Sequence, residues 1–340
     1  MPLSHFLQRV VNRQDLSMEE AHAAMSALLE GQAGAAEIGA LLLALKMKGE
    51  TAQELAGFAR AMREKAVFVD ARLDGAALVD TCGTGGTGDG TFNISTVAAM
   101  VMAGAGAKVA KHGNRSVSSA TGGSADMMEA LGVRFAMSPE DAALAIREIG
   151  IGFLFAPHLH PAMKHAQPVR KELKVRTVFN LLGPLTNPAR AQAQLIGAPS
   201  GEAAKLMAEA LAMLGTGRAF VVHGHGGIDE ISLSGATEVY EVRGNRAERH
   251  TWSPSDFGVK ESTESLAGGD GARNAEIARE ILRGAKGARR DIVTMNAAAG
   301  LVAAGIAKNL KAGVEMARKA IDSGAALGKL ESLREKFPHS

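Results

Sequence analysis

The fold is decided by one glycine-rich stretch, Asp80-Thr81-Cys82-Gly83-Thr84-Gly85-Gly86-Thr87-Gly88-Asp89-Gly90, in which five of eight consecutive positions are glycine. It follows an apolar run at residues 76–80 that predicts a short buried strand. Residues 91–96 then lead, with several hydroxyl side chains, into an apolar helix predicted for residues 97–103. This order is typical of a phosphate cradle, because free N–H groups and the positive end of a helix dipole both attract an anion.

This loop is neither of the two best-known phosphate motifs. A P-loop ends in Gly-Lys-Ser/Thr, and the dinucleotide fingerprint needs a clean Gly-x-Gly-x-x-Gly. A flexible glycine turn before an ordinary Ser/Thr helix cap is the alternative interpretation. The preceding strand favours phosphate binding, and Ser95 and Thr96 can add hydroxyl donors or bind Mg²⁺.

The rest of the chain predicts an α/β fold with a small helical domain in front of it. Only helices are predicted early in the chain, one of them with a capping box at Thr51 and Glu54. Later, strand and helix patterns alternate, which favours a mainly parallel sheet. We expect a helical domain over residues 1–72, joined by part of 161–190, and an α/β domain over residues 73–340. The further strands are predicted at residues 107–110, 152–156, 194–198 and 219–222, and the further helices at residues 124–131, 161–173, 272–283, 292–304 and 307–323.

Composition places the chain among ordinary folded proteins. Of 340 residues, 46% are hydrophobic and 22% are charged, and the net charge is +2, so neither disorder nor nucleic-acid binding is predicted. The single cysteine, Cys82, excludes an intrachain disulfide framework and disfavours a cysteine-based zinc site. No apolar run reaches the ~20 residues that span a bilayer, and residues 1–10 lack a signal-peptide pattern. We expect a cytoplasmic protein without a membrane or nucleic-acid partner.

A second polar loop follows the strand predicted at residues 107–110. It reads Lys111-His112-Gly113-Asn114-Arg115-Ser116-Val117-Ser118-Ser119, and its two cations, glycine and three serines suit a phosphorylated ligand. The alternative interpretation is a solvated polar loop. Loops at the carboxyl ends of strands usually carry the ligand in an open α/β sheet, so we expect this loop beside the glycine loop.

A third loop carries two adjacent carboxylates, Asp229 and Glu230, at the end of His223-Gly224-His225-Gly226-Gly227-Ile228-Asp229-Glu230. Like charges repel, so the pair favours a cation, and Mg²⁺ prefers a few carboxylates together with phosphate oxygens. A solvated acidic pair is the alternative. His223 and His225 give only a weak zinc signal, because a third nitrogen or sulfur ligand is lacking.

A basic segment follows another predicted strand. His160 flanks the helix predicted for residues 161–173, whose i, i+4 face carries Lys164, and Arg170 lies further along it. A guanidinium there can hold a substrate carboxylate with two hydrogen bonds, while a basic helix facing water is the alternative. The sequence has no Gly-x-Ser-x-Gly elbow and no His-Glu-x-x-His motif. Cys82 lacks a clear activating base and is expected to be a buried strand-end residue.

Together these segments resemble the anthranilate phosphoribosyltransferase family over nearly the whole chain. The most specific parts of the resemblance are residues 91–96, 111–119, 156–162, 169–173, 176–188 and 226–233. The resemblance implies the fold of the pyrimidine nucleoside phosphorylases and a homodimer formed through the helical domain. It also implies transfer of the 5-phosphoribosyl group from phosphoribosyl pyrophosphate (PRPP) to the amine of anthranilate. The products are N-(5-phosphoribosyl)anthranilate and pyrophosphate, and the reaction belongs to L-tryptophan biosynthesis.

The resemblance also implies the site residues. Two Mg²⁺ ions are implied, one held by Ser95 and Glu230 and the other by Asp229 and Glu230. Arg170 would hold the anthranilate carboxylate. The residues implied for anthranilate are Gly83, Asn114, His160 and Arg170. The residues implied for PRPP are Gly83, Gly86, Thr87, Thr91, Asn93, Ile94, Ser95, Thr96, Lys111, His112, Gly113, Asn114, Arg115, Ser116, Val117, Ser118, Ser119 and Ser124.

The chain departs from the family pattern in two places. Thr87 stands where members usually carry aspartate, and Asp89 lies two positions later, where its carboxylate can substitute. The turn at residues 120–124 is one residue longer than usual, which bears on the phosphate role of Ser124.

Two other functions fit parts of the sequence. The glycine loop also resembles that of a pyrimidine nucleoside phosphorylase, although residues 111–119 and the Asp229–Glu230 pair suit pyrophosphate and Mg²⁺ better. A non-catalytic relative that binds nucleic acid should carry a basic stripe and a degraded donor loop. This chain has a net charge of only +2 and keeps most of the loop.

Overall fold

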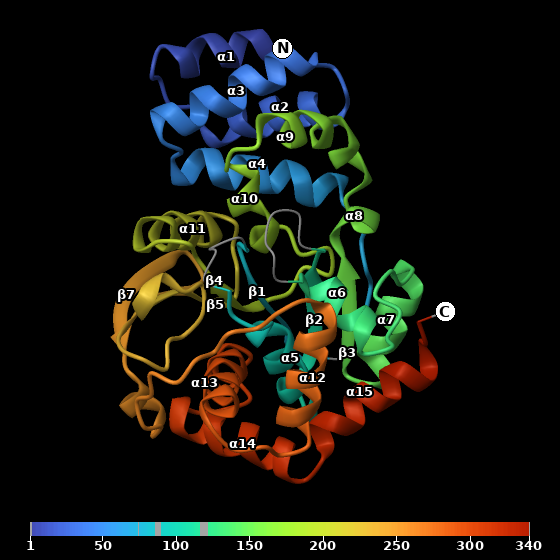
Figure 1. Ribbon diagram of the computed structural model, residues 1–340. Helices are drawn as coiled ribbons and strands as arrows, with labels where there is room; N and C mark the ends of the chain where they lie inside the picture. Colours follow the sequence, from blue (N-terminus) through green and yellow to red (C-terminus); the bar gives the residue numbers. More distant parts are fainter. Residues whose placement is uncertain (1, 74, 86–89, 116–121, 340) are drawn as a thin grey trace.

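A small all-helical domain sits on one side of a larger α/β domain (Figure 1). The computed structural model describes residues 2–73, 75–85, 90–115 and 122–339. Within these ranges, no helix has the length and apolar character needed to cross a bilayer. The arrangement confirms the predicted fold class, a helical domain in front of an α/β domain with a mainly parallel sheet.

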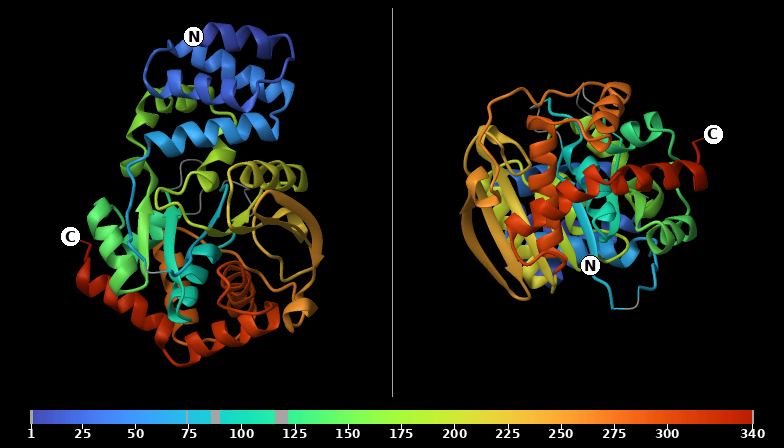
Figure 2. Two further views of the ribbon diagram at one scale, coloured as in Figure 1. Left: turned by 180° about the vertical axis from the view of Figure 1, so that it is seen from behind. Right: turned by 90° about the horizontal axis from the view of Figure 1, so that it is seen from below.

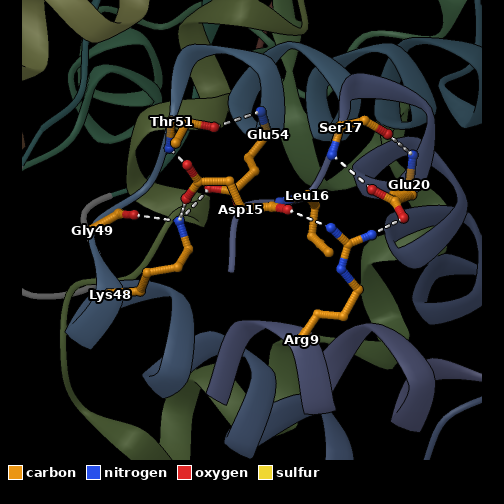
Figure 3. A network of polar contacts seen from close by, with 9 residues as sticks. All are labelled: Arg9, Asp15, Leu16, Ser17, Glu20, Lys48, Gly49, Thr51 and Glu54. Atoms are coloured by element: carbon orange, nitrogen blue, oxygen red, sulfur yellow. Dashed lines mark hydrogen bonds and ion pairs between the residues drawn. The ribbon is translucent and has the colours of Figure 1, made fainter. Parts of the chain in front are cut away.

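The helical domain is held by caps that the sequence predicts. The Ser17 and Thr51 hydroxyls accept hydrogen bonds from the amides of Glu20 and Glu54, whose carboxylates accept from the cap amides in return (Figure 3). These caps fix where two of the helices begin, and the helices then bury their apolar faces against one another. The helices are α1 (Leu3–Val11), α2 (Met18–Leu29), α3 (Ala35–Lys48) and α4 (Ala52–Lys65).

The α/β domain is built on a sheet whose seven strands, counted over the described residues, follow the order β3-β2-β1-β4-β5-β6-β7. The first five strands are parallel, as predicted, whereas β6 and β7 form an antiparallel hairpin that the sequence prediction missed. The chain winds in opposite directions on the two sides of β1 and β4, and such a switch point is where ligands usually bind. The strands are β1 (Leu78–Gly83), β2 (Lys108–Gly113), β3 (Ile151–Phe155), β4 (Ala193–Gly197), β5 (Arg218–Gly224), β6 (Thr237–Arg243) and β7 (Arg246–Trp252).

Helices cover both faces of the sheet (Figure 2). On one face, α5 (Ile94–Gly104) and α13 (Ala288–Ala303) pack on the central strands. On the other face, α11 (Gly201–Met213) packs on β5 and β6 and also on α4, so that its core is continuous with that of the helical domain. The remaining long helices are α6 (Ser124–Ala130), α7 (Pro139–Glu148), α12 (Gly271–Leu282), α14 (Leu310–Asp322) and α15 (Ala325–Lys336).

The prediction of one helix over residues 161–173 is wrong. Pro161 and Pro168 each lie in the first turn of a new helix, where the missing N–H costs nothing. In a single helix over residues 161–173, Pro161 would be tolerated at the start, but Pro168 would remove a hydrogen bond and clash with the preceding turn. His160 and Lys164 therefore do not share one α-helical face. The segments formed instead are α8 (Ala156–Leu159), a 3-10 helix (Pro161–His165) and α9 (Gln167–Leu173).

The segment that begins with α9 folds back onto the helical domain. α9 packs on α3, and α10 (Phe179–Leu182) packs on α4. Val169 and Phe179 are buried in the same apolar cluster as the side chains of the helical domain. A 3-10 turn (Gly183–Leu185) follows α10 and leads back toward β4. Figure 1 shows α10 between α4 and the sheet. The segment therefore connects the two domains.

Candidate active site

The ends of β1, β4 and β5 meet around Asp229. Its Oδ2 accepts a hydrogen bond from the Gly85 amide at 3.2 Å. Gly83 and Gly197, which end β1 and β4, make room for this approach. A Cβ on Gly83 would lie 2.4 Å from Asp229 Oδ2, and one on Gly197 would lie 1.6 Å from the Asp229 carbonyl oxygen. A side chain at position 197 would collide with the Asp229 backbone, and one at position 83 would push the Asp229 carboxylate aside. Glycine at both positions therefore lets the third loop touch the first.

The start of α5 meets the second carboxylate. α5 begins at Ile94, three residues before the predicted start, so Ser95 and Thr96 lie in its first turn. The Ser95 amide donates to Glu230 Oε1 at 3.1 Å, which places a nearly buried carboxylate at the positive end of the helix dipole. The Thr96 hydroxyl is buried without a hydrogen-bond partner in the described part of the chain. Ile94 is buried in the apolar core, so only its backbone can face a ligand.

The turn before α5 is held by the stretch just before α6 and by two residues from the C-terminal half of the chain. Asn93 Nδ2 donates to the Gly122 carbonyl at 3.1 Å, and Asn93 Oδ1 accepts from Asn274 Nδ2 at 2.9 Å. Thr91 forms an isolated antiparallel bridge with Ala267. These contacts set the entry of the chain into α5 and therefore the direction of its first amides.

The second loop leaves β2 beside the start of α6. Gly113 packs so closely that a Cβ would lie 2.4 Å from Ser124 Oγ. The Ser124 hydroxyl donates to the Asn114 carbonyl and accepts from the Asn114 amide, both at 3.2 Å. Ser124 therefore ties the loop to the helix. The structure shows Ser124 holding Asn114, and its role toward a phosphate stays a prediction.

Arg115 is paired with α6. Its guanidinium forms ion pairs with Asp126 and, at 2.8 Å, with Glu129, and its Cζ lies 4.5 Å from the centre of the Phe135 ring. The hydrogen bonds to Glu129 and Asp126 raise the pKa of Arg115 above its usual range. A phosphate at Arg115 would compete with two carboxylates, so the predicted donor contact of Arg115 stays a prediction.

Lys111 and His112 are buried at the end of β2 instead of being displayed on the loop. Asp80, fully buried on β1, accepts hydrogen bonds from the His112 amide at 3.0 Å and from Asn187 Nδ2 at 2.8 Å. Burial raises the pKa of Asp80, against the opposing effects of Lys111 and these hydrogen bonds. The sequence analysis assigned no role to Asp80 or Asn187, because only the tertiary fold shows that they support the end of β2.

His112 and His160 lie side by side, with ring centres 5.3 Å apart. His112 Nδ1 lies 3.2 Å from the Gly183 carbonyl, and a hydrogen bond to the backbone of Thr186 engages His160. Burial lowers the pKa of His112 to about 3, with smaller effects from His160 and Lys111, and burial lowers the pKa of His160 to about 4. Both rings are therefore neutral at neutral pH. The Gly183 carbonyl can only accept, so the His112 proton lies on Nδ1 and its lone pair on Nε2. Within the described residues the Nε2 atoms of both rings are buried without a partner.

Two arginines lie on the segment that connects the domains. Arg170, on α9, is partly buried with its Cζ 5.1 Å from the centre of the Phe179 ring, and burial lowers its pKa. Arg176 Nη1 donates to the Gly85 carbonyl at 2.8 Å. Sequence reasoning assigned no role to Arg176, although residues 176–188 belong to the resemblance.

The two histidines of the third loop lie at a surface hollow. His223 and His225 line a hollow together with Glu238 and Arg249, and His223 Nδ1 lies 3.0 Å from the Ala198 carbonyl. No group of three or more His, Cys, Asp or Glu side chains that could hold a metal occurs among the described residues. The zinc interpretation therefore gains no support here.

Several predicted residues lie outside the ranges that the structure describes, and their roles stay predictions. They are Gly86, Thr87, Asp89, Ser116, Val117, Ser118 and Ser119.

Each of the two domains matches a known protein family. Residues 4–66 match the model of a glycosyl transferase family helical bundle domain, and residues 75–327 match that of a glycosyl transferase family a/b domain. Anthranilate phosphoribosyltransferase from Solibacter usitatus is 60% identical over 336 residues, which cover 98% of each chain. The enzyme of the same name from Desulforamulus reducens is 51% identical over 98% of this chain and 96% of its own.

Solved structures show the same likeness. The crystal structure of anthranilate phosphoribosyltransferase from Thermus thermophilus has a TM-score of 0.91 at 45% identity, with 99% of both chains covered. The Saccharomyces cerevisiae enzyme, solved in complex with PRPP and Mg, has a TM-score of 0.87 at 30% identity and covers 98% of this chain and 97% of its own. Sequence and fold agree over the full described length, and the chain belongs to the anthranilate phosphoribosyltransferase family of glycosyl transferases.

Proposed function

We propose that this chain transfers the 5-phosphoribosyl group from PRPP to the amine of anthranilate, giving N-(5-phosphoribosyl)anthranilate and pyrophosphate in L-tryptophan biosynthesis. One observation carries the proposal: the turn at Gly85, the start of α5 and the Asp229–Glu230 pair are tied together at one edge of the sheet. Backbone N–H groups, a helix N-terminus and two carboxylates in one place suit a diphosphate bound with divalent cations. The S. cerevisiae relative in complex with PRPP and Mg supports this interpretation.

The residues present fit Mg²⁺. Asp229, Glu230 and the Ser95 hydroxyl offer only oxygen ligands, which Mg²⁺ prefers. We infer two ions, one held by Ser95 and Glu230 and one by Asp229 and Glu230. When bound, Mg²⁺ would neutralise charge on the departing pyrophosphate. The chain itself contributes by holding the carboxylates through the Gly85 and Ser95 amides.

The acceptor would bind between the domains. Arg170 carries a guanidinium on the segment that connects them, suited to hold a carboxylate with two hydrogen bonds. Asn114, Gly83 and His160 complete the proposed pocket.

Positioning would account for most of the catalysis. An arylamine is already neutral near neutral pH and needs no strong base. The two neutral imidazoles and the fixed amides around Asp229 can therefore act by orienting two charged substrates, an effect that is worth several orders of magnitude in rate.

Loss of anthranilate fluorescence tests the proposal directly. The enzyme mixed with anthranilate, PRPP and Mg²⁺ should remove the fluorescence at a rate proportional to enzyme concentration. A pyrimidine nucleoside with phosphate should yield no free base. Release of free base without consumption of anthranilate would instead assign the chain to the nucleoside phosphorylases, and salt-sensitive DNA retention without either reaction would favour the nucleic-acid-binding alternative.

We also infer a homodimer formed through the helical domain, as the resemblance implies. Leu43 and Met47, one turn apart on α3, are 37% and 76% exposed, and Val11 on the neighbouring α1 is 63% exposed. We infer that these three exposed side chains on two packed helices belong to one apolar patch, and such a patch commonly marks an interface. We further propose that the boundary between the helical and α/β domains lies near residue 72. We also propose that the protein acts in the cytoplasm, where the single Cys82 would stay reduced.

A further inference from the structure

We propose that Arg176 is a positioning residue that fixes the first turn of the glycine loop against the segment connecting the domains. That turn belongs to the proposed donor site. The identity of the donor rests on the proposed function. The inference goes beyond it, because it gives a role to a side chain outside the proposed substrate-binding set.

The Gly85 residue is held from both sides. Its amide donates to Asp229 Oδ2 at 3.2 Å, and its carbonyl accepts from Arg176 Nη1 at 2.8 Å. The preceding amide, that of Thr84, donates to the Gly197 carbonyl at 3.0 Å. Gly85 adopts a φ of +68°, a left-handed conformation that glycine reaches without strain. One cation, one carboxylate and one backbone carbonyl from distant parts of the chain therefore hold this turn.

The backbone that carries Arg176 is fixed at both ends. Lys174 ends α9 in the left-handed conformation with a φ of +52°. On the other side, the Thr177 amide donates to Asn180 Oδ1 at 2.9 Å as α10 begins. The same short stretch carries Arg170, the proposed acceptor residue. The anchor of the donor loop and the acceptor side chain are thus parts of one rigid connection between the domains.

The charge of Arg176 suits this task. A carbonyl oxygen that turned toward a diphosphate would repel it, whereas amide N–H groups attract it. Arg176 donates a charge-assisted hydrogen bond to the Gly85 carbonyl, and such a bond is stronger than a neutral one. The Gly85 amide meanwhile donates its hydrogen bond to Asp229 Oδ2. The loop is thereby oriented before the donor arrives, which lowers the cost of binding it.

Two variants separate positioning from simple loss of structure. Arg176→Met should raise the Kd for PRPP with Mg²⁺, measured by calorimetry, by about tenfold or more, as expected when a charge-assisted hydrogen bond is lost. Arg176→Lys should recover part of the affinity, since an ammonium can still donate to the carbonyl. The KM for anthranilate should change by less than about twofold, because these variants keep Arg170 and the other residues proposed to bind the acceptor.

Arg218→Met is the matched control. Arg218 Nη1 also donates to a backbone carbonyl, that of Val302, at 2.8 Å, but at the start of β5, the opposite end from the site. This variant loses a guanidinium–carbonyl bond and also the ion pair of Arg218 with Glu241, and it should still keep the wild-type Kd for PRPP. An equal loss of affinity in Arg176→Met and Arg218→Met would overturn the proposal, because it would reveal a general effect of destabilisation.

Hydrogen exchange in the protein without substrate supplies the second readout. The Gly85 amide should exchange faster in Arg176→Met than in the wild type and Arg218→Met, because the carbonyl anchor is gone. Weaker PRPP binding with unchanged Gly85 exchange would mean that Arg176 touches the donor directly, which would overturn the positioning role. If the wild type itself fails to bind PRPP, the proposed function fails, while the exchange comparison still tests the anchor.

Discussion

The rings of His112 and His160 lie 5.3 Å apart at the end of β2, and the fold keeps both of them uncharged. Burial lowers their pKa values from 6.5 to about 3 and about 4. In the unfolded chain both imidazoles return to the ordinary value. Between pH 6.5 and about 4 the unfolded chain therefore binds protons that the folded chain does not.

Stability should consequently fall as the pH drops through this window. Each histidine adds up to about 1.4 kcal/mol per pH unit to the slope of the unfolding free energy against pH. Above pH 6.5, the pKa in the unfolded chain, neither histidine adds to this slope. Urea unfolding at stepped pH measures the slope. His160→Gln should flatten it, whereas replacement of the exposed His5 should not. The same slope in His160→Gln and in the wild type would contradict the assignment.

Arg170→Ala should raise the KM for anthranilate far more than the KM for PRPP, by about tenfold or more if a bidentate carboxylate contact is lost. Lys171 is the matched control, because it is the next residue on α9 and is exposed. Lys171→Ala should leave both constants near the wild-type values. Steady-state kinetics with each substrate varied in turn distinguishes the cases, and equal rises in both constants would count against Arg170 as the carboxylate ligand.

Asp229→Asn together with Glu230→Gln should abolish the response of activity to Mg²⁺. The amide oxygens can still accept the hydrogen bonds from the Gly85 and Ser95 amides, so the loop geometry should survive while the charge is lost. A Mg²⁺ titration of PRPP binding measures the effect, with the exposed Glu261→Gln as control. A metal titration unchanged from the wild type would rule out these carboxylates as Mg²⁺ ligands.

Much of this architecture follows from local sequence signals. The capping box at Thr51 and Glu54 predicts the start of α4 to the residue, and the glycine loop predicts a strand end and a helix start around it. Such signals act over a few residues and need no tertiary information. The β6–β7 hairpin also had a signal, alternation on either side of Gly244-Asn245, which the sequence prediction did not use.

The contacts that assemble the site had no such signal. Arg176 and Gly85 are 91 residues apart in the chain, and Asp229 and Gly85 are 144 apart. No periodicity or motif spacing encodes which distant loops meet, because that depends on strand order. The burial of His112 was missed for the same reason: in sequence it belongs to a polar loop, yet the end of β2 lies beneath the 3-10 turn at Gly183.

The apolar patch of Val11, Leu43 and Met47 leads to a prediction about assembly. Met47→Glu, or Leu43→Glu, should shift the protein from dimer to monomer, because a charge at the centre of an apolar interface must be desolvated. Sedimentation or light scattering over a range of concentrations measures the mass. Met213→Glu is the control, since Met213 is 47% exposed on α11, outside the patch. A monomeric wild type would refute the proposed dimer.

A buried ion pair in the helical domain supplies the last prediction (Figure 3). The fully buried Glu54 carboxylate accepts from the Leu16 amide at 3.0 Å, the Thr51 amide at 2.8 Å and Lys48 Nζ at 3.0 Å. It therefore fixes the loop before α2, the start of α4 and the end of α3 together. Lys48 Nζ also contacts Asp15 Oδ1 at 2.7 Å, but the Asp15 side chain is 65% exposed.

Glu54→Ala should lower the free energy of unfolding by about 3–5 kcal/mol, because it removes the buried carboxylate partner of Lys48 and leaves the Leu16 and Thr51 amides without their acceptor. Asp15→Ala removes the solvent-exposed carboxylate partner of the same ammonium and should cost less than about 1 kcal/mol. Urea unfolding followed by circular dichroism compares the two variants directly. Since both remove one carboxylate from Lys48, the difference between them isolates burial as the cause. Equal losses would show that the network depends on the charge of Lys48 instead of the buried position of Glu54.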